Sequence, residues 1–159
     1  MSKQKSQASK EEVPKPIEPL VVDAENTVAG RLATVVAKQL LQGEHVAVIN
    51  AEKAVLSGDR ASLIRAYKER LGIRTRTAPW KGPLHPRQPD FMLRRIIRGM
   101  VPWKKDRGRK AMKRLRVYTG TPEGLKTKRQ LDISEYERKG RRTVYLGDIA
   151  RELGWKELG

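Results

Sequence analysis

Residues 46–50 (VAVIN) form an apolar run without alternation of apolar and polar side chains. Such a run is typical of a strand buried on both faces of a sheet, which is the usual situation of a parallel strand. A second short run, LVVD at 20–23, lies one helix length upstream. A strand, a helix and a strand at this spacing predict a parallel pair joined by a right-handed crossover. The chain is therefore expected to adopt an α/β fold.

The segment between these two runs has the periodicity of a helix. Its apolar residues recur at 28, 32, 35, 36 and 40, and polar residues occupy the opposite face. Thr27 is the expected N-cap and Gly43 the expected C-cap. Residues 54–56 are a candidate for a further short strand. A second helix is predicted at about 59–71, with four residues facing inward: Leu63, Ile64, Tyr67 and Leu71.

The positive charge of the chain is concentrated in one block, residues 73–119. This basic block holds fifteen Lys or Arg against two acids, a net charge of +13 in a chain whose formal charge is +17. Residues 20–72 hold seven basic and six acidic side chains, so that part is a nearly neutral scaffold. Charge at such density repels itself in the folded state and is tolerated mainly where a polyanion neutralises it. Nucleic acid is the expected polyanion.

The basic block divides into three pieces. Residues 73–89 contain four prolines, which exclude a helix and predict an extended basic arm. The second piece is a helix that begins at Asp90 and ends near Gly99, and Leu93, Ile96, Ile97 and Met100 should be buried. The third piece, residues 104–114, places like charges four positions apart, which makes it a poor isolated helix and favours a helix that lies against phosphate. Residues 115–118, which follow, are predicted to be the last strand of the sheet.

The candidate RNA-binding residues are the basic side chains of these pieces and two tryptophans among them. A spread over several elements suits the backbones of a folded RNA better than the single recognition helix of a duplex reader. The tryptophans could stack on unpaired bases or anchor the arm to the protein's own core, and the sequence leaves both open. The candidates are Arg74, Arg76, Trp80, Lys81 and Arg87 on the arm, Arg94, Arg95 and Arg98 on the helix, and Trp103, Lys104, Lys105, Arg107, Arg109, Lys110, Lys113 and Arg114 after it.

Composition along the chain suggests three parts. Residues 1–19 have almost no large apolar side chains and are predicted to be a flexible tail. Residues 20–120 are the expected α/β RNA-binding domain, which contains the basic block. Residues 121–159 are the expected C-terminal extension, closed by a short helix at 147–153 whose apolar side carries Ile149, Ala150, Leu153 and Trp155.

Other function classes receive little support from the sequence. The absence of Cys excludes disulfides and thiolate metal sites and fits a reducing cytosol. His45 and His85 are too few for a histidine metal site or a nucleophilic triad. No dinucleotide fingerprint or Walker-type loop occurs, and the longest apolar run of four residues predicts no membrane span. We therefore expect no catalytic residue, metal, cofactor or small-molecule substrate.

Two motifs have both a functional and a structural interpretation. Residues 23–27 (DAENT) follow a predicted strand, as does the aspartyl nucleophile loop of haloacid-dehalogenase-like phosphatases, although the second acid there should be Asp. The preference of acidic groups for a helix N-terminus explains this motif equally well. Residues 146–154 (LGDIARELG) look like the first half of a helix-turn-helix, but too few residues follow for a recognition helix.

Several segments resemble, in order and spacing, the large-subunit ribosomal protein thirteen family, over about residues 20–120. The most specific of them is RGMVP at 98–102. The others are VDAE at 22–25 with GRLA at 30–33, VINAEK at 48–53, and RG at 107–108 with LRVY at 115–118. KGPLHPR at 81–87 and the closing YLG to GWK at 145–156 are similar to the archaeal and eukaryotic branch.

This resemblance implies a three-layer α/β domain with a mostly parallel sheet of about four strands flanked by helices, besides the basic arm and the C-terminal extension. It also implies a non-enzymatic protein that binds large-subunit ribosomal RNA, neighbours other ribosomal proteins and supports subunit assembly in the cytoplasmic ribosome. A free-standing nucleic-acid-binding regulator on the same fold and a metal-dependent phosphatase that acts through Asp23 stay open as alternatives.

Overall fold

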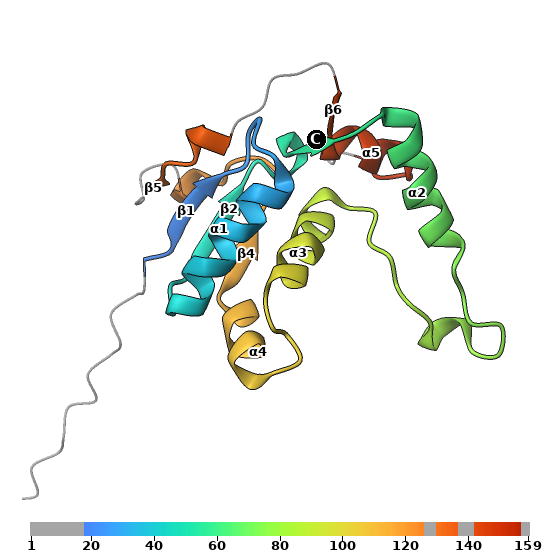
Figure 1. The fold of residues 1–159 in the computed structure, drawn as a ribbon, viewed down its shortest axis with the longest axis horizontal. Helices are drawn as coiled ribbons and strands as arrows, with labels where there is room; N and C mark the ends of the chain where they lie inside the picture. The colour runs from blue at the N-terminus through green and yellow to red at the C-terminus, as the bar shows by residue number, and fades with distance from the viewer. Residues whose placement is uncertain (1–17, 126–129, 137–141, 157–159) are drawn as a thin grey trace, which may run out of the picture.

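The structure is a computed structural model that describes residues 18–125, 130–136 and 142–156. The tail predicted at 1–19 therefore lies outside the described residues, apart from its last two positions. Within the described part, every strand and helix of the α/β core can be assigned, and Figure 1 shows their arrangement.

The core of the fold is one sheet whose neighbouring strands are all parallel, in the order β4-β2-β1-β5. All four residues of β2 are buried, although alternate side chains point to opposite faces, so the sheet is covered on both faces. The predicted parallel pair and the mostly parallel sheet flanked by helices are confirmed. The strands are β1 (Leu20–Asp23), β2 (Val46–Ile49), β4 (Leu115–Val117) and β5 (Gln130–Leu131).

Helix α1 (Ala29–Gln42) connects β1 to β2 and buries the predicted face, with Leu32, Val36 and Leu40 fully inaccessible. Gly43 ends it at φ 107°, a left-handed conformation that glycine adopts without a Cβ clash. The predicted N-cap is wrong. The capping position is Val28, whereas Thr27 is buried and its hydroxyl donates to the Glu25 carbonyl at 3.1 Å.

Helix α3 (Pro89–Met100) packs against α1 and contacts β4, and helix α4 (Asp106–Lys113) follows it. Leu93 and Ile97 are fully buried, as predicted. Met100 is 49% exposed, so its assignment to the buried face is wrong. The buried face of α3 includes Met92 instead. Val101, the residue after the helix, lies in the core in place of Met100.

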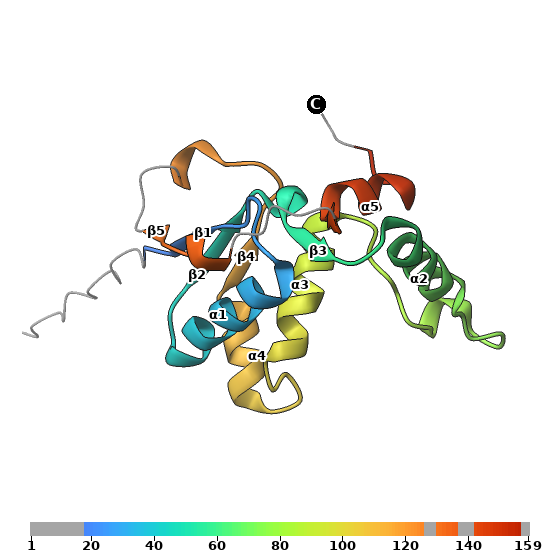
Figure 2. The same ribbon diagram turned by 45° about the horizontal axis from the view of Figure 1, so that its top comes forward.

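Helix α2 (Arg60–Gly72) begins where predicted, at Asp59, whose carboxylate accepts hydrogen bonds from the backbone N–H and hydroxyl of Ser62. The backbone bond is the main reason why the pKa of Asp59 is lowered. No residue of α2 is buried, so the four side chains predicted to face inward are only partly covered. The reason is that α2 lies at the side of the domain, against α5 (Leu146–Glu152) and away from the main sheet (Figures 1 and 2).

The chain after residue 120 contributes to both sheets. Residues 115–118 are an edge strand, β4, but not the last strand of the sheet as predicted, because β5 pairs with β1 further along the chain. The candidate strand at 54–56 forms as β3 (Val55–Ser57) and pairs antiparallel with β6 (Thr143–Tyr145) in a separate two-stranded sheet. The predicted closing helix is α5, and Ile149 and Ala150 are buried in it.

Candidate nucleic-acid interface

The helices α3 and α4 and the turn between them, residues 89–113, form a unit that we call the helical platform. Its two helices are held close by Gly108, the third residue of α4, which is buried against the preceding turn. A Cβ at this position would lie 2.1 Å from the Pro102 carbonyl oxygen and 2.7 Å from the Trp103 nitrogen, closer than any side chain tolerates. Glycine at 108 therefore fixes where the cations of α4 lie.

Two candidate arginines, one on the platform and one directly after it, are held by backbone carbonyls rather than by acids. Arg94 donates from Nη2 to the Met112 carbonyl at 3.5 Å, which connects α3 to the end of α4. Arg114 donates from Nη1 to the Leu40 carbonyl at 3.1 Å, near the C-terminal end of α1. Because the carbonyl groups are neutral, these contacts orient the guanidinium groups without cancelling their charge.

Arg98 and Trp103 form a stacked pair, with the Arg98 guanidinium carbon 3.9 Å from the centre of the Trp103 ring. A cation over an aromatic face is an attractive arrangement. Trp103 is still 42% exposed, so it is not anchored in the core and part of its ring is accessible. Of the two interpretations that the sequence left open for Trp103, packing into the core is therefore excluded.

The arm, residues 73–88, is described throughout and contains no strand. Its one regular element is a short 3-10 turn, η2 (Pro79–Lys81), so the predicted extended arm without an α-helix is confirmed. Pro79 fits there because the first position of a helical turn needs no N–H donor. Trp80 is 75% exposed and Leu84 is 79% exposed, which shows that neither side chain anchors the arm to the core.

Arg95 holds the arm where it returns to α3. Its Nη1 donates to the Leu84 carbonyl and to His85 Nδ1, each at 3.1 Å. Since arginine has only donors, Nδ1 is the acceptor, and the neutral ring carries its proton on Nε2. That Nε2 is shielded from solvent and has no partner in the described part of the chain. Burial, followed by the charges of Arg95 and Arg70, lowers the pKa of His85.

Most of the candidate cations have side chains without a partner among the described residues. Among the described residues, the one ion pair between the basic block and an acid joins Arg109 to Asp106, at 3.6 Å on an exposed helix surface. Such an exposed pair contributes little to stability. Nine candidates have exposed side chains that make no hydrogen bond or ion pair to the described residues: Arg74, Arg76, Lys81, Arg87, Lys104, Lys105, Arg107, Lys110 and Lys113.

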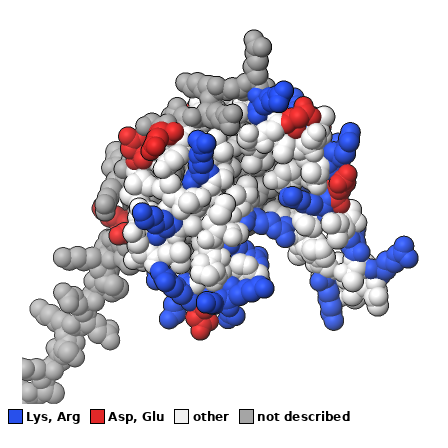
Figure 3. All heavy atoms as spheres, in the orientation of Figure 1, with Lys and Arg blue, Asp and Glu red and all other residues white. Residues whose placement is uncertain are grey.

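These free cations lie on two parts of the surface, the arm and the platform. Figure 3 shows Lys and Arg gathered over α4 at the bottom of the view and along the arm on the right, with a hollow between the two. The acids in the same view lie mostly over other parts of the surface. Unneutralised cations on both sides of a concavity create a field that attracts polyanions.

Asp23, the alternative nucleophile, has a structural role instead. Its Oδ1 accepts hydrogen bonds from the Glu25 N–H at 3.0 Å and from the Asn50 side-chain amide at 2.9 Å. Asn50 in turn accepts from the Thr121 hydroxyl, so the network ties together the ends of β1 and β2 and the segment after β4. The described residues contain no group of three or more His, Cys, Asp or Glu positioned to hold a metal ion.

By its fold and this surface, the chain is an α/β protein with an exposed basic block that can bind a polyanion. No helix in the described part of the chain is both long and apolar enough to cross a bilayer. Comparison with known proteins gives the family. The family model described as ribosomal protein L13 matches residues 18–124.

Relatives named large ribosomal subunit protein uL13 match most of the chain. The protein of Methanopyrus kandleri is 43% identical over 153 residues, which cover 91% of this chain and 94% of that protein. The protein of Methanosarcina barkeri is 43% identical over 140 residues, 86% of this chain and 98% of that protein. The protein of Aeropyrum pernix is also 43% identical over 140 residues, 86% and 90% of the two chains.

The chain belongs to the ribosomal protein L13 family. It is therefore an archaeal-type structural protein of the large ribosomal subunit and not an enzyme. The resemblance found in the sequence is confirmed, and the phosphatase alternative is excluded.

Proposed function

We propose that the chain binds large-subunit ribosomal RNA through the arm and the helical platform, and that it positions RNA backbones during assembly of the subunit. The observation that carries this proposal concerns the described residues, among which nine exposed candidate cations have unpartnered side chains and the basic block forms one exposed ion pair with an acid. Cations of this kind release the counterions of phosphate groups when they bind RNA, which drives association.

The two parts of the surface would act together as a clamp. Arg94, Arg98 and Arg114 are oriented by carbonyl or ring contacts, so little side-chain entropy is lost when phosphates approach them. The arm would reach RNA on the other side of the hollow, and Trp80 is exposed enough to stack on an unpaired base. We place the protein in the cytoplasmic ribosome, with other ribosomal proteins as its neighbours.

The salt dependence of RNA binding tests this function. With about five phosphates neutralised, the logarithm of affinity for an archaeal large-subunit ribosomal RNA transcript should fall against the logarithm of salt with a slope of about −4. A slope shallower than about −1 would contradict the proposal. Arg31→Ala, on the exposed face of α1, is the control and should leave the slope unchanged.

Sedimentation separates a ribosomal role from that of a free-standing regulator. The protein should travel with the large subunit through a sucrose gradient at moderate salt. A regulator would stay near the top of the gradient, and recovery of the protein only there would overturn the assembly role.

A further inference from the structure

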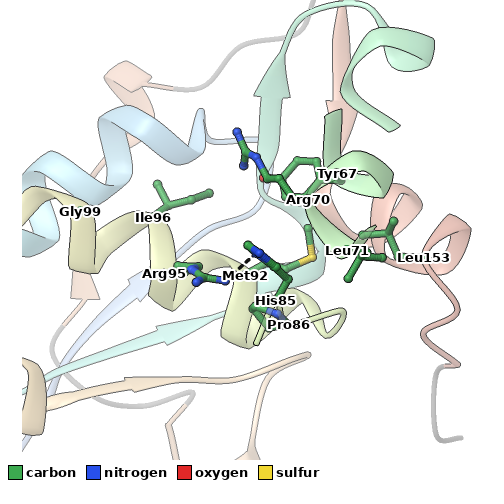
Figure 4. Close-up of a pocket in the computed structure, with 10 residues that line it drawn as sticks. All are labelled: Tyr67, Arg70, Leu71, His85, Pro86, Met92, Arg95, Ile96, Gly99 and Leu153. Atoms are coloured by element: carbon green, nitrogen blue, oxygen red, sulfur yellow. Dashed lines mark hydrogen bonds between the residues drawn. The ribbon is translucent and has the colours of Figure 1, made fainter. Parts of the chain in front are cut away.

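A cleft of about 400 Å³ lies between α2 and α3 and is closed at one end by the returning arm. Figure 4 shows side chains from α2, α3, the arm and the end of α5 around it. Its floor includes Met92 and Leu153, which are buried, and its walls include Tyr67, Leu71 and Ile96, which are half-buried. The volume lies in the range of small-ligand sites, roughly 300–1,000 Å³.

The walls of the cleft are apolar surface that the protein itself does not cover. Helix α2 has thirteen residues and none of them is buried, although Tyr67 and Leu71 pack at the edge of the core. Apolar side chains on a helix normally face a partner. The cleft therefore offers ring and aliphatic surface to a flat, weakly polar group.

The charges around the cleft decide what kind of group can enter. Arg70 and Arg95 are among the lining residues, and no acid is. The Arg70 guanidinium lies 5.2 Å from the centre of the Tyr67 ring, so the positive charge is next to the aromatic surface. A second cleft of similar size, about 370 Å³, is lined by Glu25, Glu52 and Asp148 as well as by Lys53 and Arg151, so acids oppose its cations.

We propose that the cleft between α2 and α3 receives one unpaired nucleotide of the bound RNA. The base lies against Tyr67 and Ile96, and Arg70 and Arg95 meet its phosphates. Arg95 uses Nη1 for the arm, which leaves the other N–H groups of its guanidinium to donate. Since every base has an aromatic face, the site accepts an unpaired nucleotide with little preference for sequence. This inference rests on the proposed function, because the nucleotide is delivered by the RNA on the basic block.

A glycine in the wall allows the cleft to be filled without a change in the core. Gly99 lines the cleft, lies in α3 and has no atom within 4 Å of the position of a Cβ. Gly99→Leu should therefore fold, since leucine is also the better helix former, and its side chain should occupy the space of the base. Gly30→Leu is the matched control, because Gly30 also lies in a helix with open space at its Cβ but far along the chain, in α1.

The test measures binding of the full chain to an archaeal large-subunit ribosomal RNA transcript, together with ultraviolet crosslinking and mass spectrometry of the attached peptides. Gly99→Leu should lower affinity about tenfold, because its side chain removes the stacking of the base in the cleft. Tyr67→Leu should have a similar effect, and the parent should crosslink through the cleft segments of α2 or α3. Gly30→Leu should bind as the parent does.

Two results would overturn the proposal. In the first, both cleft variants bind with the affinity of the parent, while loss of Lys110 and Lys113 weakens binding; the basic block then binds RNA and the cleft does not. In the second, the cleft crosslinks to a neighbouring ribosomal protein in reconstituted subunits, which would identify an acidic protein segment as its occupant. If the cleft variants and the variant without Lys110 and Lys113 all bind RNA as the parent does, the proposed function itself is rejected.

Discussion

The arm and the helical platform carry cations of the same kind, but the protein holds them differently. On the platform, Arg94 is fixed by a carbonyl and Arg98 by an aromatic ring, and Gly108 locks α4 against the preceding turn. On the arm, the side chains of Arg74, Arg76 and Lys81 have no partner among the described residues. Three arm amides, those of Ile73, Lys81 and Gly82, donate to backbone carbonyls.

This difference indicates a division of work between the two regions. Because Arg94 and Arg98 are already oriented, these two platform arginines lose little entropy on binding and can set the position of the RNA. An arm with few internal hydrogen bonds has to be ordered by its partner, at a cost in free energy that its phosphate and stacking contacts must exceed. Arg95 connects the two regions, since it extends from α3 to the arm.

The largest expected effect comes from charging the core side of the platform. Ile97→Asp would bury a carboxylate at a fully inaccessible position, which should destabilise the domain by about 4 kcal/mol or more. Phe91→Asp on the same helix is the control, because Phe91 is half-exposed and should tolerate the change. Thermal unfolding measures both, and equal stability of Ile97→Asp and the parent would contradict the orientation of α3.

A smaller loss of stability is expected from Gly108→Ala. The added methyl group would overlap the Pro102 carbonyl and force α4 away from the turn, at a cost of about 3 kcal/mol. Gly30→Ala has open space at its Cβ and should instead stabilise α1 slightly. Chemical denaturation of the two variants compares them directly. A neutral Gly108→Ala would show that the platform is not locked at this turn.

Two double variants compare the RNA contacts of the regions. Arg74→Ala with Arg76→Ala on the arm, and Lys110→Ala with Lys113→Ala on the platform, each remove two free cations. Each should make the salt slope shallower by roughly 1.5 and lower the affinity about tenfold at moderate salt. Filter binding gives both quantities. An arm variant with the parent's slope would mean that the arm does not meet phosphate.

The smallest effect concerns His85, where the arm meets the platform. Burial, Arg95 and Arg70 lower its pKa in the folded protein below the ordinary value of 6.5, so the unfolded chain takes up the proton more readily. The contribution of neutral His85 to the free energy of unfolding is therefore fully present above pH 6.5, and it is lost as the pH falls below that value. His85→Gln should therefore reduce the fall in stability between pH 7 and pH 5.5. Identical curves for His85→Gln and the parent would contradict this.

The sequence predicted the parts of the fold that depend on local pattern. The unbroken apolar run of β2 and the 3.6-residue period of α1 correspond to the buried strand and helix of the structure. The sequence pattern did not predict strands that are very short or that pair with a strand far away in the chain. β5 has two residues, and β6 meets β3 across more than eighty positions of the chain, so neither left a signal in the sequence.

The candidate site shows the same limit. Charge counting located the basic block, but it could not show that Arg94 and Arg114 are held by carbonyls, because backbone acceptors have no sequence signature. The cleft residues Tyr67 and Arg70 were missed because the apolar side of α2 indicated core packing. Only the three-dimensional structure shows that the described residues leave this apolar side of α2 partly uncovered, facing the cleft.

We infer that phosphates of ribosomal RNA neutralise the cations that the protein leaves free on both the arm and the platform. The most direct measurement is an electron cryo-microscopy structure of the large subunit with this protein in place. We expect RNA phosphates within ion-pair distance of most of the nine free cations, on both sides of the hollow. Free cations that face open solvent, or that pair with acids of neighbouring proteins, would contradict it.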